Sequence, residues 1–170
     1  QLWIANNPHT FSHYPEGRID FDEVDAWDGL TSIELDQVSS LSGDELAQQA
    51  WFMKRGLDSV ANDPVLTMRR ALFKIVTVFS WKFSPAKDFM FQTVYFSSYS
   101  PILVFGLVGM FIERKRWRNY LPIYSLFLGF SVGTAVFHAH TSHRAYLDVY
   151  FMIFSAHVIM LGISRWSRRG

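Results

Sequence analysis

Residues 89–112, FMFQTVYFSSYSPILVFGLVGMFI, form an apolar run without a charged side chain, and this run decides the fold. Further apolar runs follow at 120–137 and 145–164. An α-helix rises about 1.5 Å per residue, so roughly 20 apolar residues cross a hydrocarbon core that is about 30 Å thick. The sequence therefore predicts an all-α membrane protein with about three transmembrane helices in residues 89–170.

The charges between these runs predict their orientation. The connection 113–118 (ERKRWR) and the tail 165–169 (RWSRR) are basic, whereas the connection 138–144 (HAHTSHR) holds three His and one Arg. Cytoplasmic loops of membrane proteins carry an excess of Lys and Arg. We therefore expect a protein integral to the cell membrane, with its C-terminus in the cytoplasm. Residues 1–88 and the loop 138–144 then lie on the extracytoplasmic side.

The distribution of charge agrees with a water-exposed front part and a membrane-embedded back part. All of the 15 acidic residues except Glu113 and Asp148 precede residue 89, while the 16 Lys and Arg are divided evenly there. The net charge of +1 conceals this asymmetry and gives no reason to expect nucleic-acid binding. Arginines near anionic headgroups explain the basic loops, with the lipid bilayer as partner. The absence of Cys excludes disulfides and thiol catalysis.

The chain opens with Gln1-Leu2-Trp3-Ile4, without an initiator Met or the regions of a signal peptide. Residues 1–88 must nevertheless be translocated. We therefore expect the chain to be the C-terminal part of a longer polytopic protein, whose N-terminal transmembrane part is its partner. The alternative is a processed chain whose leader has been removed.

Residues 1–63 are predicted to form a mainly helical extracytoplasmic cap. They begin with a strand-like run, residues 2–4, followed by a turn-rich stretch. Ser42 and Glu45 have the spacing of a capping box, so a helix is expected from there to about Ala61. Asp63 can cap the next helix, in which Pro64 takes the first position.

Residues 64–88 are predicted to contain an interfacial amphipathic helix that continues to about Phe83 and leads into the membrane. Its apolar face is broad, and Arg69, Arg70 and Lys74 cluster toward its first half. A basic amphipathic helix of this kind lies in the membrane interface. Two interpretations remain open: a plain surface anchor, or cations that bind a lipid-linked phosphate.

Four short phrases occur in a characteristic order along the chain. They are Ala5-Asn6-Asn7-Pro8, a helix from Ala50 to Val60-Ala61-Asn62-Asp63-Pro64, Met68-Arg69-Arg70-Ala71-Leu72-Phe73-Lys74, and His143-Arg144-Ala145-Tyr146. In this order, and with the predicted topology, the chain resembles the C-terminal part of GT-C-type membrane glycosyltransferases. The similar branch is prokaryotic and is related to dolichyl-phosphate-mannose protein mannosyltransferases and aminoarabinose transferases.

This resemblance implies transfer of a sugar from a polyprenyl-phosphate carrier to an acceptor at the extracytoplasmic face. It implies that basic residues of this chain stabilise the departing lipid phosphate. The acidic catalytic residues of such enzymes lie in a first outer loop that this chain lacks, so no catalytic residue is expected here. A divalent metal, if present, would be bound mainly outside this chain. The rival hypothesis is a non-catalytic membrane assembly module with an outer cap.

The chain departs from the family pattern after the late arginine. Family members commonly follow it with a second Arg and a Pro, whereas this chain reads Ala145-Tyr146-Leu147-Asp148. Contacts to donor or acceptor made at this point are therefore expected to differ. The residues expected to bind substrate or lipid phosphate are Asn6, Asn7, Arg69, Arg70, Lys74, His138, His140, His143 and Arg144.

The histidine loop leaves three interpretations open: a metal site, a contact to substrate or lipid phosphate, and ordinary interfacial histidines. Arg144 is the stronger candidate, because a guanidinium binds phosphate bidentately where a span begins. Asp148 lies four residues further on, and either holds Arg144 in an ion pair or lines a polar cavity. His157, in mid-span, is expected to bond a neighbouring helix.

Overall fold

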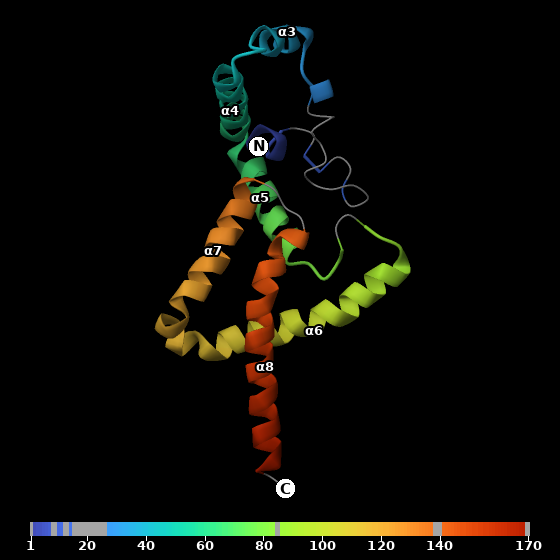
Figure 1. The fold of residues 1–170 in the computed structure, drawn as a ribbon, viewed down its shortest axis with the longest axis vertical. Helices are drawn as coiled ribbons and strands as arrows, with labels where there is room; N and C mark the ends of the chain where they lie inside the picture. Colours follow the sequence, from blue (N-terminus) through green and yellow to red (C-terminus); the bar gives the residue numbers. More distant parts are fainter. Residues whose placement is uncertain are drawn as a thin grey trace.

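The computed structural model describes residues 2–7, 10, 11, 14, 27–83, 86–137 and 141–168, and these ranges are all-helical with no strand. The all-α prediction is therefore confirmed for them. Figure 1 shows α3 and α4 at one end of the molecule and the C-terminal end of α8 at the other. The elements are α1 (Leu2–Ala5), α3 (Ser32–Ser40), α4 (Glu45–Asn62), α5 (Pro64–Val78), α6 (Phe89–Glu113), η1 (Arg114–Tyr120), α7 (Leu121–Val136), η2 (Thr141–Arg144) and α8 (Ala145–Ser167).

The first turn of the chain is helical and packs on α4. A Cβ atom at Gly56 of α4 would lie 3.0 Å from the backbone nitrogen of Trp3, so the two helices are in close contact. The buried Trp3 ring lies 5.1 Å from the ring of Phe52. The Asn6 and Asn7 amides donate to the carbonyls of Leu2 and Ile4, at 2.9 and 2.7 Å, and close the end of α1.

The prediction of a strand-like run at residues 2–4 is therefore wrong. A run of three large apolar residues fits a helical turn as well as a strand. The contact with α4 and the hydrogen bonds donated by the Asn6 and Asn7 amides stabilise the helical turn. Local propensity is a weak determinant where tertiary contacts are available.

Local capping side chains determine where α3, α4 and α5 begin. Asp44, rather than Ser42, caps α4, because its carboxylate accepts from the Ala47 N–H at 3.0 Å. The Ser42 N–H bonds the Ser39 carbonyl and belongs to the turn that follows α3. The prediction for α5 is confirmed: Asp63 accepts from Leu66 N–H at 2.8 Å, and Pro64 opens the helix. A capping box at Thr31 and Glu34, which starts α3, was not predicted.

Helix α5 ends at Val78, five residues earlier than predicted. The carbonyls of Val78 and Ser80 accept hydrogen bonds from the Arg144 guanidinium and so do not continue the helical ladder. One side of α5 is buried and the other is exposed, and the interfacial position of this helix stays a prediction. Lys74, Thr77 and Val78 are buried, whereas the large apolar side chains Val65, Met68, Leu72 and Val76 are exposed.

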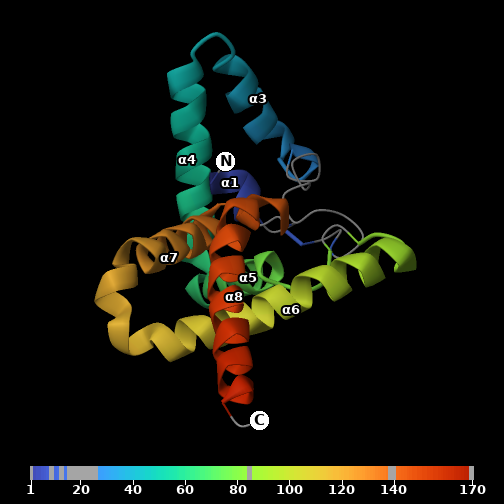
Figure 2. The same cartoon turned by 60° about the horizontal axis from the view of Figure 1, so that its bottom comes forward.

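Two stretches of the chain are long and apolar enough to cross a membrane: Phe89–Val136 and Ser142–Ser167. The first comprises α6, η1 and α7, and its helical geometry is interrupted at Arg116, where φ is −105° and ψ is 24°. Figure 2 shows the chain folding back at this point, so that α7 returns toward α5. The interruption falls within the basic connection 113–118.

Helices α6 and α8 cross in close contact (Figures 1 and 2). Gly106 and Gly109 of α6 face Phe151 and Phe154 of α8. The Ser155 hydroxyl of α8 donates to the Ile102 carbonyl of α6 at 2.8 Å. Small residues and hydroxyl bonds are the usual means by which apolar helices associate in lipid, where apolar surface gives no driving force.

Candidate functional site

Lys74 of α5 joins two of the sequence phrases that carry the resemblance. Its side chain is 0% exposed, and its Nζ donates to the Ala5 carbonyl at 2.7 Å and to Asn6 Oδ1 at 3.3 Å. One turn earlier on α5, Arg70 Nη1 donates to the Asn7 carbonyl at 3.0 Å. Residues separated by more than 60 positions are thus held together by charge-assisted hydrogen bonds. We call Asn6, Asn7, Arg70 and Lys74 the α1–α5 cluster.

The α1–α5 cluster also reaches the end of α7. The Asn6 amide donates to the Val136 carbonyl at 2.7 Å, and Val136 is the last residue of α7. Asn6 and Asn7 are both buried, and the Asn7 N–H donates to the Thr10 hydroxyl at 3.1 Å. The cluster therefore connects the cap, α5 and one end of the apolar helices.

Two cations are placed close together in this cluster at an electrostatic cost. Burial, and secondly the charge of Arg70, lower the pKa of Lys74 to about 8. Burial also lowers the pKa of Arg70, while Asp63 opposes that shift. A lysine with this pKa is still mostly cationic at neutral pH. The site thus has a positive potential, which favours an anion nearby.

The remaining basic candidates differ in exposure. Arg69 of α5 is exposed and makes no hydrogen bond or ion pair with the described part of the chain. His143 is exposed at the η2 turn, next to the buried Arg144. His138 and His140 lie outside the described residues. Among the residues that are described, no three His, Asp or Glu side chains form a group able to hold a metal ion.

Arg144 is 1% exposed and binds three other segments of the chain. Its Nη1 donates to the Val78 carbonyl and, at 3.1 Å, to the Ser80 carbonyl. Its Nη2 donates to the Tyr95 hydroxyl of α6, and its Cζ lies 3.6 Å from the centre of the Tyr99 ring. Its Nε is 3.4 Å from Asp148 Oδ1. A guanidinium has five N–H donors, and most of those of Arg144 are engaged inside the protein.

Two roles are predicted here from the sequence: phosphate binding by Arg144, and an ion pair or a cavity-lining position for Asp148. The (i, i+4) ion pair with Asp148 is present. Sequence reasoning did not single out Tyr95 and Tyr99, although their own four-residue spacing places both on the face of α6 that meets Arg144. Arg144 is therefore a structural link between α5, α6 and α8, and phosphate binding by it stays a prediction.

A second polar pair lies between the two crossing helices. His157 Nε2 is 3.0 Å from Glu113 Oε1, so His157 does contact a neighbouring helix. Glu113 is buried at the end of α6, with Arg116 at 3.9 Å. Sequence patterns did not indicate this partner, because Glu113 stands among the basic residues of the 113–118 connection. The pair contributes to the α6–α8 contact.

Comparison with known proteins adds no relative: no family model, no curated protein and no solved structure matches the chain. The resemblance to GT-C-type glycosyltransferases therefore rests on the order of the four sequence phrases and on the predicted topology, and it stays a prediction.

Proposed function

We propose that this chain is the C-terminal part of an integral-membrane glycosyltransferase that moves a sugar from a polyprenyl-phosphate carrier to an acceptor at the extracytoplasmic face. The observation that supports it best is the α1–α5 cluster. Two phrases of the resemblance, at residues 5–8 and 68–74, are bound to each other through Lys74, Asn6 and Arg70. An unrelated anchor helix has no need to bury a lysine on this asparagine phrase.

The proposed topology has three spans, formed by α6, α7 and α8. The contacts agree with this order: Tyr95 meets Arg144 where α6 and α8 begin, and Glu113 meets His157 further along both helices. Residues near the start of α6 thus meet the start of α8 and residues near its end meet α8 further along, although the two helices cross at a wide angle (Figures 1 and 2). The α1–α5 cluster and Arg144 then lie together at the extracytoplasmic boundary, opposite the basic connection 113–118.

Reporter fusions test this topology. A reporter inserted after Arg116 or fused after Arg168 is expected to be cytoplasmic, and one inserted beside Thr141 is expected to be extracytoplasmic, because Lys and Arg are retained in the cytoplasm. A glycosylation acceptor and a phosphatase fusion at each position measure the two sides independently. A cytoplasmic reporter at Thr141 would remove the basis of the whole proposal.

We place the lipid phosphate beside Arg69 and Arg70. Arg69 is exposed, and the potential of the α1–α5 cluster adds to its charge. Further along, Ile75 and Val76 of α5, and Phe79 directly after it, line an apolar cavity of about 480 Å³ that continues onto α6, α7 and α8. A cationic surface followed by an apolar cavity on one helix suits a phosphate attached to a long hydrocarbon chain. Lys74 and Arg144 act as positioning residues.

The proposed chemistry is an inverting transfer. A base in the preceding part of the protein removes the proton of an acceptor hydroxyl, whose oxygen forms a bond to the anomeric carbon of the sugar. The bond from that carbon to the phosphate oxygen breaks, and its electron pair leaves with the lipid phosphate. Cations of α5 stabilise the charge that develops on this phosphate.

A transfer assay on the full-length protein tests the role of Arg69. Arg69→Ala should reduce transfer about ten- to a hundredfold, since a charge-assisted hydrogen bond contributes about 1.5–3 kcal/mol. Arg69→Lys should fall in between, because an ammonium does not reproduce the planar fork. Lys54→Ala, which removes an exposed cation from α4, is the matched control. Unchanged transfer by Arg69→Ala would contradict the placement, and no transfer by the wild type from any polyprenyl-phosphate sugar would favour the assembly module.

A further inference from the structure

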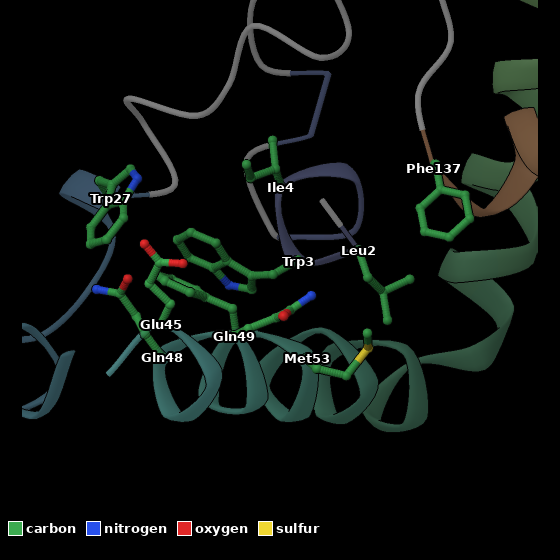
Figure 3. Close-up of a pocket in the computed structure, with 10 residues that line it drawn as sticks. Leu2, Trp3, Ile4, Trp27, Glu45, Gln48, Gln49, Met53 and Phe137 are labelled. Carbon is green, nitrogen blue, oxygen red and sulfur yellow. The ribbon is translucent and has the colours of Figure 1, made fainter. Parts of the chain in front are cut away.

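The cap holds a cavity of about 450 Å³ between α1 and the first half of α4 (Figure 3). Its volume falls within the roughly 300–1,000 Å³ of small-molecule pockets. The proposed phosphate contacts do not involve it, although Phe52 and Met53 lie within the sequence phrase that begins at Ala50. Its walls are formed by α1 and the first half of α4, together with Trp27 and Phe137.

Three polar side chains enter this cavity from one face of α4. Glu45, Gln48 and Gln49 are separated by three and four residues, so they share a helix face. Figure 3 shows the side chains of Glu45 and Gln49 rising from α4 toward α1. Within the described residues none of the three makes a side-chain hydrogen bond or an ion pair. Together they offer two amides and a carboxylate, which both donate to and accept from hydroxyl groups.

Aromatic rings stand beside these polar groups. Trp27 and Phe52 are half-buried, and Trp3 lies buried next to both, with ring centres 6.1 Å from Trp27 and 5.1 Å from Phe52. The planes of Trp3 and Trp27 are inclined at 84°, so the aromatic wall has two orientations. Rings of this kind give large contact areas at small entropic cost.

The far end of the cavity is apolar. Leu2, Met53 and Phe137 lie together there, away from Trp27 and Glu45 (Figure 3). Phe137 directly follows α7, so this end of the cavity adjoins the apolar helices. The cavity is therefore two-sided, with amides, a carboxylate and aromatic rings at one end and apolar side chains at the end nearer the membrane region.

We propose that this cavity binds a neutral saccharide, with its apolar end taking the group attached to the sugar. A sugar ring has apolar C–H faces that pack on aromatic rings and equatorial hydroxyls that bond amides and carboxylates. Glu45 and Gln49 are exposed and Gln48 is half-buried, so an apolar ligand that covered them would remove their hydration without offering partners, at a cost. An anionic ligand would be repelled by Glu45. That this saccharide is the acceptor of the transfer rests on the proposed function.

Saturation-transfer NMR tests the binding with the whole chain in lauryldimethylamine oxide, a detergent without a sugar headgroup. The probes are the methyl glycosides of glucose, galactose, mannose, arabinose and N-acetylglucosamine, with methylcyclohexanol as an apolar probe of similar size. At least one glycoside should receive saturation on its ring C–H protons. Gln48→Ala/Gln49→Ala should weaken its binding about tenfold, since two hydrogen bonds are lost. Trp27→Leu, which keeps an apolar side chain, should also weaken it.

The matched control is Lys54→Ala/Asp58→Ala, a double change at exposed positions of α4 that do not line the cavity. Circular dichroism shows whether each variant retains the helical content of the wild type. The proposal is overturned if no glycoside receives saturation, if the glutamine variant binds as well as the wild type, or if the control variant loses as much. It is also overturned if methylcyclohexanol binds as tightly as the best glycoside.

The two proposals fail separately. Glycoside binding by a protein that transfers no sugar would uphold this cavity as a saccharide site and remove the transferase. Transfer by a protein to which none of the glycosides binds would uphold the transferase and remove the cavity as a saccharide site.

Discussion

Gly109→Ala is expected to destabilise the protein by about 1–3 kcal/mol, although it adds a single methyl group. A Cβ atom at this position would lie 2.5 Å from the Phe154 carbonyl oxygen and 2.9 Å from its carbonyl carbon. These are backbone atoms of α8, so no side-chain rotation relieves the overlap, and the helices must separate. Separation would also lengthen the 2.8 Å bond from Ser155 to the Ile102 carbonyl. Gly109→Leu should have a larger effect.

Thermal unfolding in detergent measures this effect against two controls. A Cβ atom at Gly129 of α7 or at Gly162 of α8 meets nothing within 4 Å. Alanine at these positions should leave the unfolding midpoint unchanged or raise it, because glycine is the poorer helix former by about 1 kcal/mol. A second measurement uses the absence of native Cys in the chain. One cysteine is introduced into α6 and one into α8, and spin labels on this pair report the distance between the two helices. An unchanged midpoint and distance in Gly109→Ala would show that the observed crossing is not the one in the membrane.

The helices follow closely from the sequence, because their signals are local. The apolar runs at 89–112, 120–137 and 145–164 correspond to α6 (Phe89–Glu113), α7 (Leu121–Val136) and α8 (Ala145–Ser167). Asp63 and Pro64 mark the start of α5 unambiguously. At the start of α4 the sequence offers two capping residues, Ser42 and Asp44, which are equally good in chemistry. Ser42 belongs to the turn that follows α3, so Asp44 is left to cap α4. The position of that turn cannot be read from capping preferences.

The site is predictable only where its contacts are short-range. The pair of Arg144 and Asp148 follows from their (i, i+4) spacing. Lys74 and Asn6 are 68 positions apart, and a single sequence contains no pattern that predicts their contact. The sequence phrases of the resemblance identify both residues as candidates but do not predict that they are in contact. Likewise, the Glu113–His157 pair forms through the packing of α6 on α8, which no local sequence pattern predicts. The cavity between α1 and α4 has the same origin, since residues far apart in the sequence form it together.

Arg144→Ala is expected to be the most destabilising single change in the chain, at about 3–5 kcal/mol. It removes the buried partner of the Val78 and Ser80 carbonyls, of the Tyr95 hydroxyl and of Asp148 at once. Each buried group that is left without a hydrogen bond costs about 1–3 kcal/mol in lost solvation, partly recovered where water enters. Arg144→Lys should recover only part of the loss, because one ammonium does not reach the Val78 and Ser80 carbonyls and the Tyr95 hydroxyl together.

The Asp148→Asn variant separates the structural role of Arg144 from a phosphate-binding role. The amide introduced by this change keeps a side-chain oxygen near Nε, and Arg144 retains its bonds to α5 and α6, so destabilisation should be smaller than in Arg144→Ala. If Arg144 acts by positioning α5, then transfer by the full-length protein should decline in step with the unfolding midpoint across Arg144→Ala, Arg144→Lys and Asp148→Asn. If Arg144 instead binds the lipid phosphate, Arg144→Lys should lose transfer while its midpoint stays near that of Asp148→Asn. An Arg144→Ala protein with a wild-type midpoint would refute the structural role, because the buried guanidinium would then have contributed nothing to the packing of α5, α6 and α8.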